Sequence, residues 1–97
     1  MPRPALASEE DINMALKGLP LWMREDKTIV REIAASNFAA AIGVINAVAL
    51  IAEKMDHHPD IFLYGWNKIR LTLSTHDKGG LTELDFKAAK LIDDLKF

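Results

Sequence analysis

The sequence predicts an α+β fold in which an antiparallel sheet carries its helices on one face. Segments with the two-residue alternation of strands lie between segments with the period of helices. The connections between them are short, which favours antiparallel neighbours. The predicted order is helix, two strands, helix, one or two strands, helix. The length of 97 residues suits a single domain spanning 1–97.

The first helix and the hairpin after it are predicted by caps, breakers and alternation. Residues 8–11 match a capping box, and Gly18 and Pro20 end the helix near Lys17. Residues 21–25 and 28–34 then alternate as two strands of a hairpin. Arg31 interrupts the apolar face of the second strand between Ile29 and Ile33.

The second helix is predicted from Ser36 or Asn37, either of which can cap it, to about Met55. It is apolar almost all the way round, whereas a surface helix of a small monomer has a polar face. We therefore expect the helix 37–55 to meet another subunit. The alternative is a deeply buried central helix.

The remaining elements surround three histidines. Pro59 disfavours helix at His58, and residues 60–65 are extended or loop. Residues 67–75 alternate as the clearest strand, which would place His76 on the polar face in line with Ser74 if it continued. After the turn at 79–80, residues 82–85 form a second capping box. The last helix runs to about Lys96 with this predicted core stripe: Leu84, Ala88, Leu91 and Leu95.

The stretch E-K-M-D-H-H-P-D, residues 53–60, is the best candidate for chemistry. Glu53 precedes His57 by one helical turn, so its carboxylate could orient that ring and raise the basicity of the other nitrogen. The alternative is that His57 only caps the helix C-terminus. His76 by itself would be an ordinary solvated residue. No H-x-x-H or H-x-x-x-H spacing occurs, so we predict no metal site.

The chain resembles the pterin-4a-carbinolamine dehydratase family in these motifs. The resemblance rests on Glu53, on H-H-P at 57–59, on an aromatic residue at Trp66 or Tyr64, and on L-S-T-H-D-K-G-G-L-T-E-L-D at 73–85, which contains His76 and Asp85. Upstream, Trp22 is similar to the N-terminal tryptophan of the family, although Leu21 stands where glycine is usual. The likeness covers nearly the whole chain.

The resemblance implies a fold and a reaction. The fold would be a four-stranded antiparallel sheet with three helices packed on one face, in the order α-β-β-α-β-β-α. The reaction would be dehydration of 4a-hydroxytetrahydropterin to quinonoid dihydropterin by histidine acid/base catalysis. It would support tetrahydrobiopterin recycling and use no metal and no cofactor. The alternative is a protein-interaction module, the dimerisation cofactor of a transcription factor, on the same fold.

The resemblance also implies roles for individual residues. His57, His58 and His76 would be catalytic: His57 and His76 as acid and base, His58 mainly as a substrate holder. The expected substrate contacts are these three histidines with Asp56, Ser74, Thr75 and Asp77. The expected supporting residues are Glu53, Trp66 and Asp85, and Asp85 could serve as helix cap as well.

Composition limits the kinds of binding partner that we expect for this protein. A formal net charge of -2 gives no electrostatic case for direct nucleic-acid binding. The absence of cysteine fits the cytoplasm. The N-terminus lacks the apolar region of a signal peptide, and the apolar run 38–52 is short for a membrane span. We expect a homodimer or homotetramer that binds a pterin, with a protein partner as a further option.

Overall fold

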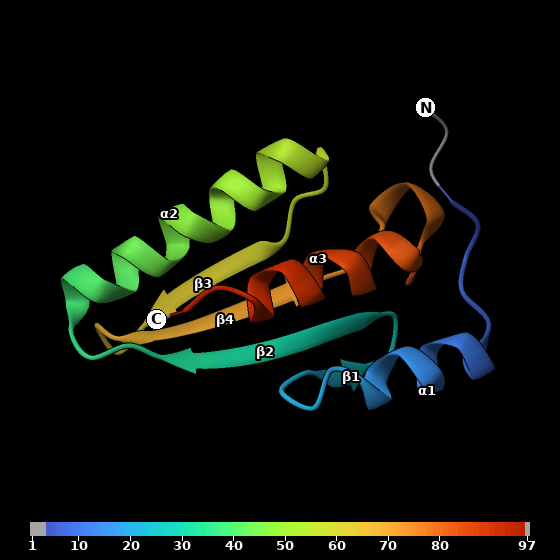
Figure 1. Cartoon of the computed structure of the whole chain (residues 1–97), viewed down its shortest axis with the longest axis horizontal. Helices are drawn as coiled ribbons and strands as arrows, with labels where there is room; N and C mark the ends of the chain where they lie inside the picture. The colour runs from blue at the N-terminus through green and yellow to red at the C-terminus, as the bar shows by residue number, and fades with distance from the viewer. Residues whose placement is uncertain (1–3, 97) are drawn as a thin grey trace.

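The computed structural model describes residues 4–96 and confirms the α+β fold (Figure 1). Its helices are α1 (Glu9–Lys17), α2 (Phe38–Met55) and α3 (Glu83–Asp93). Its strands are β1 (Met23–Glu25), β2 (Thr28–Ala34), β3 (Asp60–Tyr64) and β4 (Lys68–Leu73). A short 3-10 helix, η1 (His76–Lys78), lies between β4 and α3. The segment after Pro59, for which the sequence predicts extended structure or a loop, is strand β3.

The four strands form one antiparallel sheet in the order β1-β2-β4-β3. The predicted β1–β2 hairpin is present, but β1 begins at Met23 rather than Leu21. The backbone N–H of Trp22 donates to the carbonyl of Leu19, which holds Leu21 in a turn. Strand β4 ends at Leu73 rather than Thr75. The chain turns there because the N–H groups of Lys78 and Gly79 fold back onto the carbonyl of Thr75.

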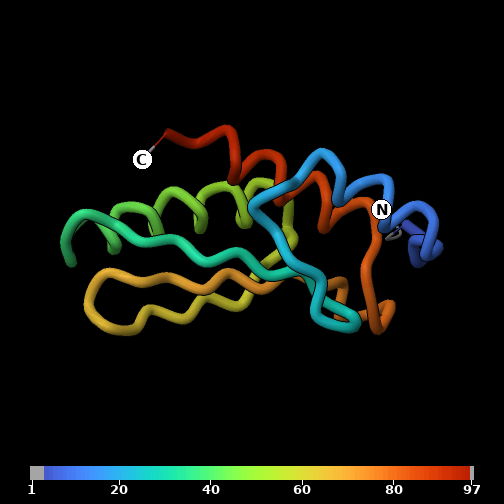
Figure 2. The backbone as a smooth tube through the Cα atoms, turned by 90° about the horizontal axis from the view of Figure 1, so that it is seen from below, coloured from blue at the N-terminus to red at the C-terminus, as the bar shows by residue number. Residues whose placement is uncertain are grey.

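The core lies between one face of the sheet and the helices. Figure 2 shows the helices on the same side of the strands. Cross-strand partners share a face, so Ile29 opposite Leu73 and Ile33 opposite Ile69 point the same way. The buried core side chains of the sheet are Ile29, Ile33, Ile69, Leu71 and Leu73, and those of the helices are Ile12, Ala41, Val44, Val48, Ala88, Ala89 and Ile92.

Arg31 lies on this same face, opposite Leu71, where the sequence showed imperfect alternation. Its guanidinium donates to Asp93 Oδ1 of α3 at 2.7 Å. The indole N–H of Trp22 donates to the same oxygen at 2.9 Å. The charged residue inside the apolar pattern therefore forms an ion pair that ties α3 to the interior strand β2.

Helix α2 begins at the cap Asn37, whose side-chain oxygen accepts from the N–H of Ala40 at 2.7 Å. One face of the helix is buried against the core through Ala41, Val44, Val48 and Ala52. The opposite face leaves Phe38, Ile42 and Leu50 exposed, so within one chain α2 is not the deeply buried helix of the alternative interpretation. In the described part of the chain, α2 is the one helix long and apolar enough to span a membrane by length and composition. Of its 18-residue apolar segment, 22% is buried in the structure.

Helix α3 differs from its prediction in length and orientation. It ends at Asp93 rather than Lys96. Its buried residues are Asp85, Ala88, Ala89 and Ile92, whereas Leu91 of the predicted stripe is 38% exposed and Leu84 and Leu95 are only partly buried. The reason is that Asp85 turns inward to satisfy buried hydrogen bonds, which rotates the flanking leucines away from the centre of the core.

Candidate functional site

The two adjacent histidines follow a chain reversal at the end of α2 and differ in exposure. Asp56 adopts the left-handed conformation with φ 51°, and the N–H of His57 donates to the carbonyl of Ala52. This turns His57 into the protein, where it is 4% exposed, and leaves His58 at the surface. The end of α2, the end of β4 and the start of α3 lie toward the same end of the molecule (Figure 1).

His57 pairs with a carboxylate from another element. Its Nε2 lies 2.6 Å from Oδ1 of Asp85, which is 0% exposed. Asp85 occupies the predicted capping-box position at the start of α3, and both reciprocal bonds of the box are formed. One carboxylate thus caps a helix and holds an imidazole.

Two threonines complete this arrangement. Oδ2 of Asp85 accepts from the hydroxyl of Thr75 and from the backbone N–H of Thr82, both at 2.9 Å. The hydroxyls of Thr75 and Thr82 lie 2.8 Å apart, and both residues are buried. We call His57, Thr75, Thr82 and Asp85 the buried cluster. Among the residues that the structure describes, no buried side-chain nitrogen or oxygen lacks a hydrogen-bond partner.

The predicted contact between Glu53 and His57 is wrong. Oε1 of Glu53 lies 3.6 Å from Nε2 of His58, and both side chains are exposed. The spacing of one helical turn applies only while the helix continues. Because α2 ends at Met55 and Asp56 reverses the chain, His57 leaves the helical face that Glu53 occupies and His58 comes within its range.

His76 is exposed and opens η1, so the strand does not continue to it and the condition for placing it on the polar face is not met. His76 directly follows Thr75, a member of the buried cluster, in the sequence. Ser74 is partly buried, and Asp56 and Asp77 are exposed beside their histidines. Thr75, expected as a substrate contact, is 1% exposed and bonds to Asp85 instead.

The structure brings neither candidate aromatic residue to the histidines. Trp66 lies in the turn that joins β3 to β4, has φ 59° and is 62% exposed. Strand β3 separates this turn from Pro59. Tyr64 lies on the helix-free face of the sheet, where its hydroxyl donates to Glu32 Oε1 at 2.6 Å.

Thr82 is the residue of this site that sequence patterns missed. The sequence marks it as a helix cap, which is confirmed. A cap on the surface and a cap buried beside an imidazole have the same local pattern, so spacing alone could not assign it to the site. The only signal was its position three residues before an aspartate of the recognised motif.

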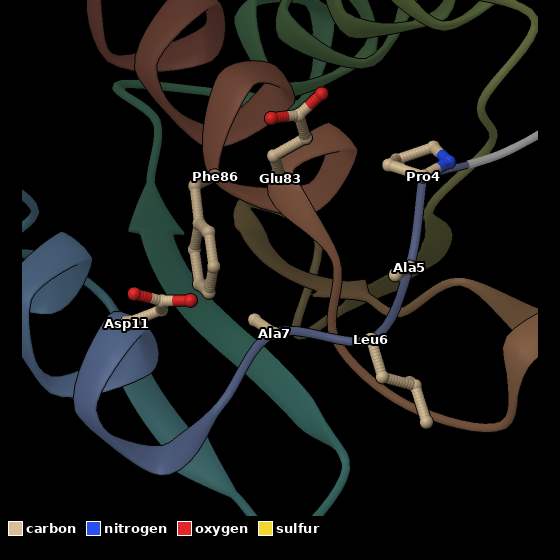
Figure 3. Close-up of a pocket in the computed structure, with 7 residues that line it drawn as sticks. All are labelled: Pro4, Ala5, Leu6, Ala7, Asp11, Glu83 and Phe86. Atoms are coloured by element: carbon tan, nitrogen blue, oxygen red, sulfur yellow. The ribbon is translucent and has the colours of Figure 1, made fainter.

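A separate cavity of about 500 Å³ lies beside the N-terminal segment (Figure 3). Asp11 of α1 and Phe86 of α3 line it, and residues 4–7 run along its edge. None of the three histidines lines this cavity, so it is distinct from the candidate site. Within residues 4–96, no three histidine or carboxylate side chains gather as metal ligands.

The arrangement suits proton transfer. A neutral imidazole that donates from one nitrogen keeps a lone pair on the other. In His57 the nitrogen that contacts Asp85 is Nε2, so Nδ1 is the other nitrogen. The exposed His58 and His76 add two further imidazoles, the side chain that most often transfers protons in enzymes.

Comparisons with known proteins identify the family of the chain. The sequence profile of the family described as pterin 4 alpha carbinolamine dehydratase matches residues 5–95. A protein of Metallosphaera sedula is 41% identical over 96 residues, covering 99% of this chain and 96% of its own. One from Chloroflexus aurantiacus is 46% identical over 95 residues, covering 98% of each chain. Both carry the provisional name pterin-4-alpha-carbinolamine dehydratase.

Solved structures share the fold. A Brucella melitensis protein described as a transcriptional coactivator/pterin dehydratase superposes with a TM-score of 0.85 at 38% identity, covering 91% of this chain and 95% of its own. A pterin dehydratase-like RuBisCO assembly factor of the alpha-carboxysome superposes with a TM-score of 0.60 at 20% identity, covering 74% and 82%, which shows the fold alone. The chain belongs to the pterin-4-alpha-carbinolamine dehydratase family.

Proposed function

We propose that this protein dehydrates 4a-hydroxytetrahydropterin to quinonoid dihydropterin and so supports tetrahydrobiopterin recycling. The observation that carries the proposal is the buried 2.6 Å contact between His57 and Asp85, beside two exposed histidines of the same family motif. The absence of cysteine agrees with a cytoplasmic location, which we include in the proposal.

The chemistry needs a proton donor and a proton acceptor. The carbon–oxygen bond at position 4a breaks, and the hydroxyl leaves as water once it receives a proton. A ring nitrogen loses a proton, and its electron pair forms the carbon–nitrogen double bond. No electron is gained or lost overall, so no redox cofactor is required. General acid–base assistance contributes roughly 10²–10⁴-fold to such a step.

The proposed roles are those that the family resemblance implies, adjusted to the contacts of Asp85, Thr75 and Glu53. His57, oriented by Asp85, and His76 exchange the protons, and His58 holds the pterin. Asp56, Ser74 and Asp77 border the exposed histidines as substrate contacts. Thr75 supports Asp85 rather than touching the substrate. Glu53 supports His58, which is the histidine that it approaches. Trp66 has no role in this proposal because it lies at the far turn of the β3–β4 hairpin.

The test follows quinonoid dihydropterin formation from chemically generated 4a-hydroxytetrahydropterin. Pure protein should accelerate the reaction above the buffer rate, and His57→Ala and His76→Ala should each lower kcat by roughly 10²-fold or more. His58→Ala should mainly raise KM. Unchanged rates in His57→Ala and His76→Ala would refute the residue roles, and no acceleration by the wild type would refute the enzyme. Full activity in EDTA is expected, since the proposed mechanism uses no metal.

The exposed face of α2 supports a second proposal, that two or four copies of this chain associate there. Phe38, Ile42 and Leu50 are 54%, 38% and 74% exposed, and no charged residue interrupts the helix from Phe38 to Ala52. A large exposed apolar patch marks an interaction surface. Analytical ultracentrifugation should show a dimer or tetramer, and Leu50→Glu should dissociate it. The control Met14→Glu changes an equally apolar residue that is 63% exposed on α1 and should leave the mass unchanged.

The same face favours the alternative function, a protein-interaction module. One structural neighbour is described as a transcriptional coactivator and another as an assembly factor. Under this alternative, the face would be shared between a second copy and a protein partner. A wild-type protein that forms oligomers and does not accelerate dehydration would favour it over the enzyme.

A further inference from the structure

We infer that Thr82 is a positioning residue that fixes the tautomer of His57 through a one-way chain of hydrogen bonds. The chain begins at a backbone amide of α3, passes through the hydroxyls of Thr82 and Thr75, and ends at the carboxylate of Asp85. Its effect on catalysis rests on the proposed dehydratase function, whereas its effect on the imidazole does not.

The direction of the chain follows from counting protons. An ionised carboxylate only accepts hydrogen bonds, so the hydroxyl of Thr75 donates its single proton to Asp85 Oδ2 at 2.9 Å. That proton is then unavailable to Thr82. In the 2.8 Å contact between the two hydroxyls, Thr82 must therefore donate and Thr75 accept.

The other end of the chain is held by the backbone. The hydroxyl oxygen of Thr82 accepts from the N–H of Leu84 at 3.2 Å, and an amide cannot reverse its role. The backbone N–H of Thr82 donates to Asp85 Oδ2 at 2.9 Å. Oδ2 thus accepts from two donors, the hydroxyl of Thr75 and the backbone N–H of Thr82.

The remaining oxygen of Asp85 fixes the imidazole. Oδ1 is 2.6 Å from Nε2 of His57, and since a carboxylate accepts, Nε2 carries the proton. In the neutral ring, Nδ1 then bears the lone pair. Thr75, Thr82 and Asp85 are each 1% exposed or less, so water cannot readily replace a lost partner. The cap of α3 thereby selects the nitrogen of His57 that can take up a proton.

The experiment measures the ring nitrogens of His57 by ¹⁵N NMR in the protein without substrate. The wild type should show a protonated Nε2 and an unprotonated Nδ1 in the neutral ring. Thr82→Val and Thr75→Val keep the shape of the side chain and remove the hydroxyl, and should give a mixture of tautomers. Thr82→Ser and Thr75→Ser keep the hydroxyl and should restore the wild-type pattern.

Kinetics supply the second readout. The valine variants should lose on the order of tenfold in kcat, by analogy with the loss seen when the outer hydrogen-bond partner of a metal-bound histidine is removed, with KM within about twofold. Ser8→Ala is the matched control because Ser8 caps α1 in the same way, accepting from the N–H of Asp11 at 3.1 Å, but lies outside the buried cluster. It should destabilise the protein without altering the His57 spectrum or kcat.

The outcomes separate this inference from the proposed function. A wild-type tautomer pattern in folded Thr82→Val and Thr75→Val would overturn the inference, whatever the activity. Thr75→Val leaves the cap of α3 intact, so it decides the question if Thr82→Val does not fold. A protein that shows the expected tautomers but does not accelerate dehydration would refute the enzyme and leave the hydrogen-bond chain standing.

Discussion

Two polar clusters on opposite faces of the sheet use the same chemistry in different surroundings. In the buried cluster, the carboxylate of Asp85 accepts hydrogen bonds from His57, from Thr75 and from the backbone N–H of Thr82. On the helix-free face, the carboxylate of Glu32 accepts hydrogen bonds from the hydroxyl of Tyr64 at 2.6 Å and from the guanidinium of Arg70 at 2.5 Å. We call Glu32, Tyr64 and Arg70 the surface cluster.

Burial makes these clusters unequal. The Asp85 side chain is 0% exposed and that of Glu32 is 48% exposed. A surface carboxylate that loses its partners binds water, whereas a buried one cannot. The shortest hydrogen-bond distances of the two clusters are similar. Because only the buried cluster is shielded from water, only its loss should strongly lower the stability of the fold and change the orientation of the His57 ring. Asp93, whose side chain is 19% exposed beside Arg31 and Trp22, is the intermediate case.

Removing the buried carboxylate should have the largest effect. Asp85→Ala leaves His57, Thr75 and the amide of Thr82 without an acceptor, and we expect a loss of about 3 kcal/mol or more in the free energy of unfolding. Urea denaturation measures it. Asp85→Asn keeps the volume and one acceptor oxygen, and should lose less. A loss below about 1 kcal/mol in Asp85→Ala would mean that water or another group can replace this carboxylate.

Removing Asp93, the partly buried partner of Arg31 and Trp22, should lower the free energy of unfolding by an intermediate amount. Asp93→Ala removes the common acceptor of Arg31 and Trp22, and we expect a decrease of about 1–3 kcal/mol in the free energy of unfolding, measured in the same way. The adjacent Asp94→Ala is the matched control, because Asp94 is exposed at the end of α3 and should change little. Equal losses in the two variants would contradict the link between burial and stability.

Glu32→Gln should shift the urea midpoint least of the three carboxylate variants. Glu32 is open to solvent, so salt screens its attraction to Arg70 and water replaces the lost bonds. If Glu32→Gln shifted the urea midpoint as much as Asp85→Ala does, burial would not explain the difference between the two clusters.

The surface cluster should nevertheless be visible in titration. The hydrogen bond from Tyr64, and then the one from Arg70, hold the pKa of Glu32 below its ordinary value. A lowered pKa means that this small contribution to stability is present above the pKa of the unfolded chain and is lost as the pH falls through the folded value. Carboxyl NMR should show Glu32 titrating low, and Tyr64→Phe should raise its pKa more than Arg70→Lys does. An unchanged pKa in Tyr64→Phe would refute this assignment.

Features within one element were predictable from the sequence because spacing along a chain reports neighbours on one helix or strand. The hairpin, the Lys68–Leu73 strand, the end of α2 at the histidines and the capping box at Asp85 are all confirmed. The same reasoning failed where the element ended. It assigned Glu53 to His57 by helical spacing, although the left-handed Asp56 breaks that spacing.

The sequence by itself determined the fold class, the family motif and the apolar character of α2. Only the tertiary structure decided which groups meet: His57 with an aspartate 28 residues away, Arg31 with one 62 residues away, and the inward turn of Asp85 that displaced Leu84 and Leu91. The physical reason is that a buried polar group must find a partner wherever packing brings one. That requirement acts across elements, where sequence spacing carries no information.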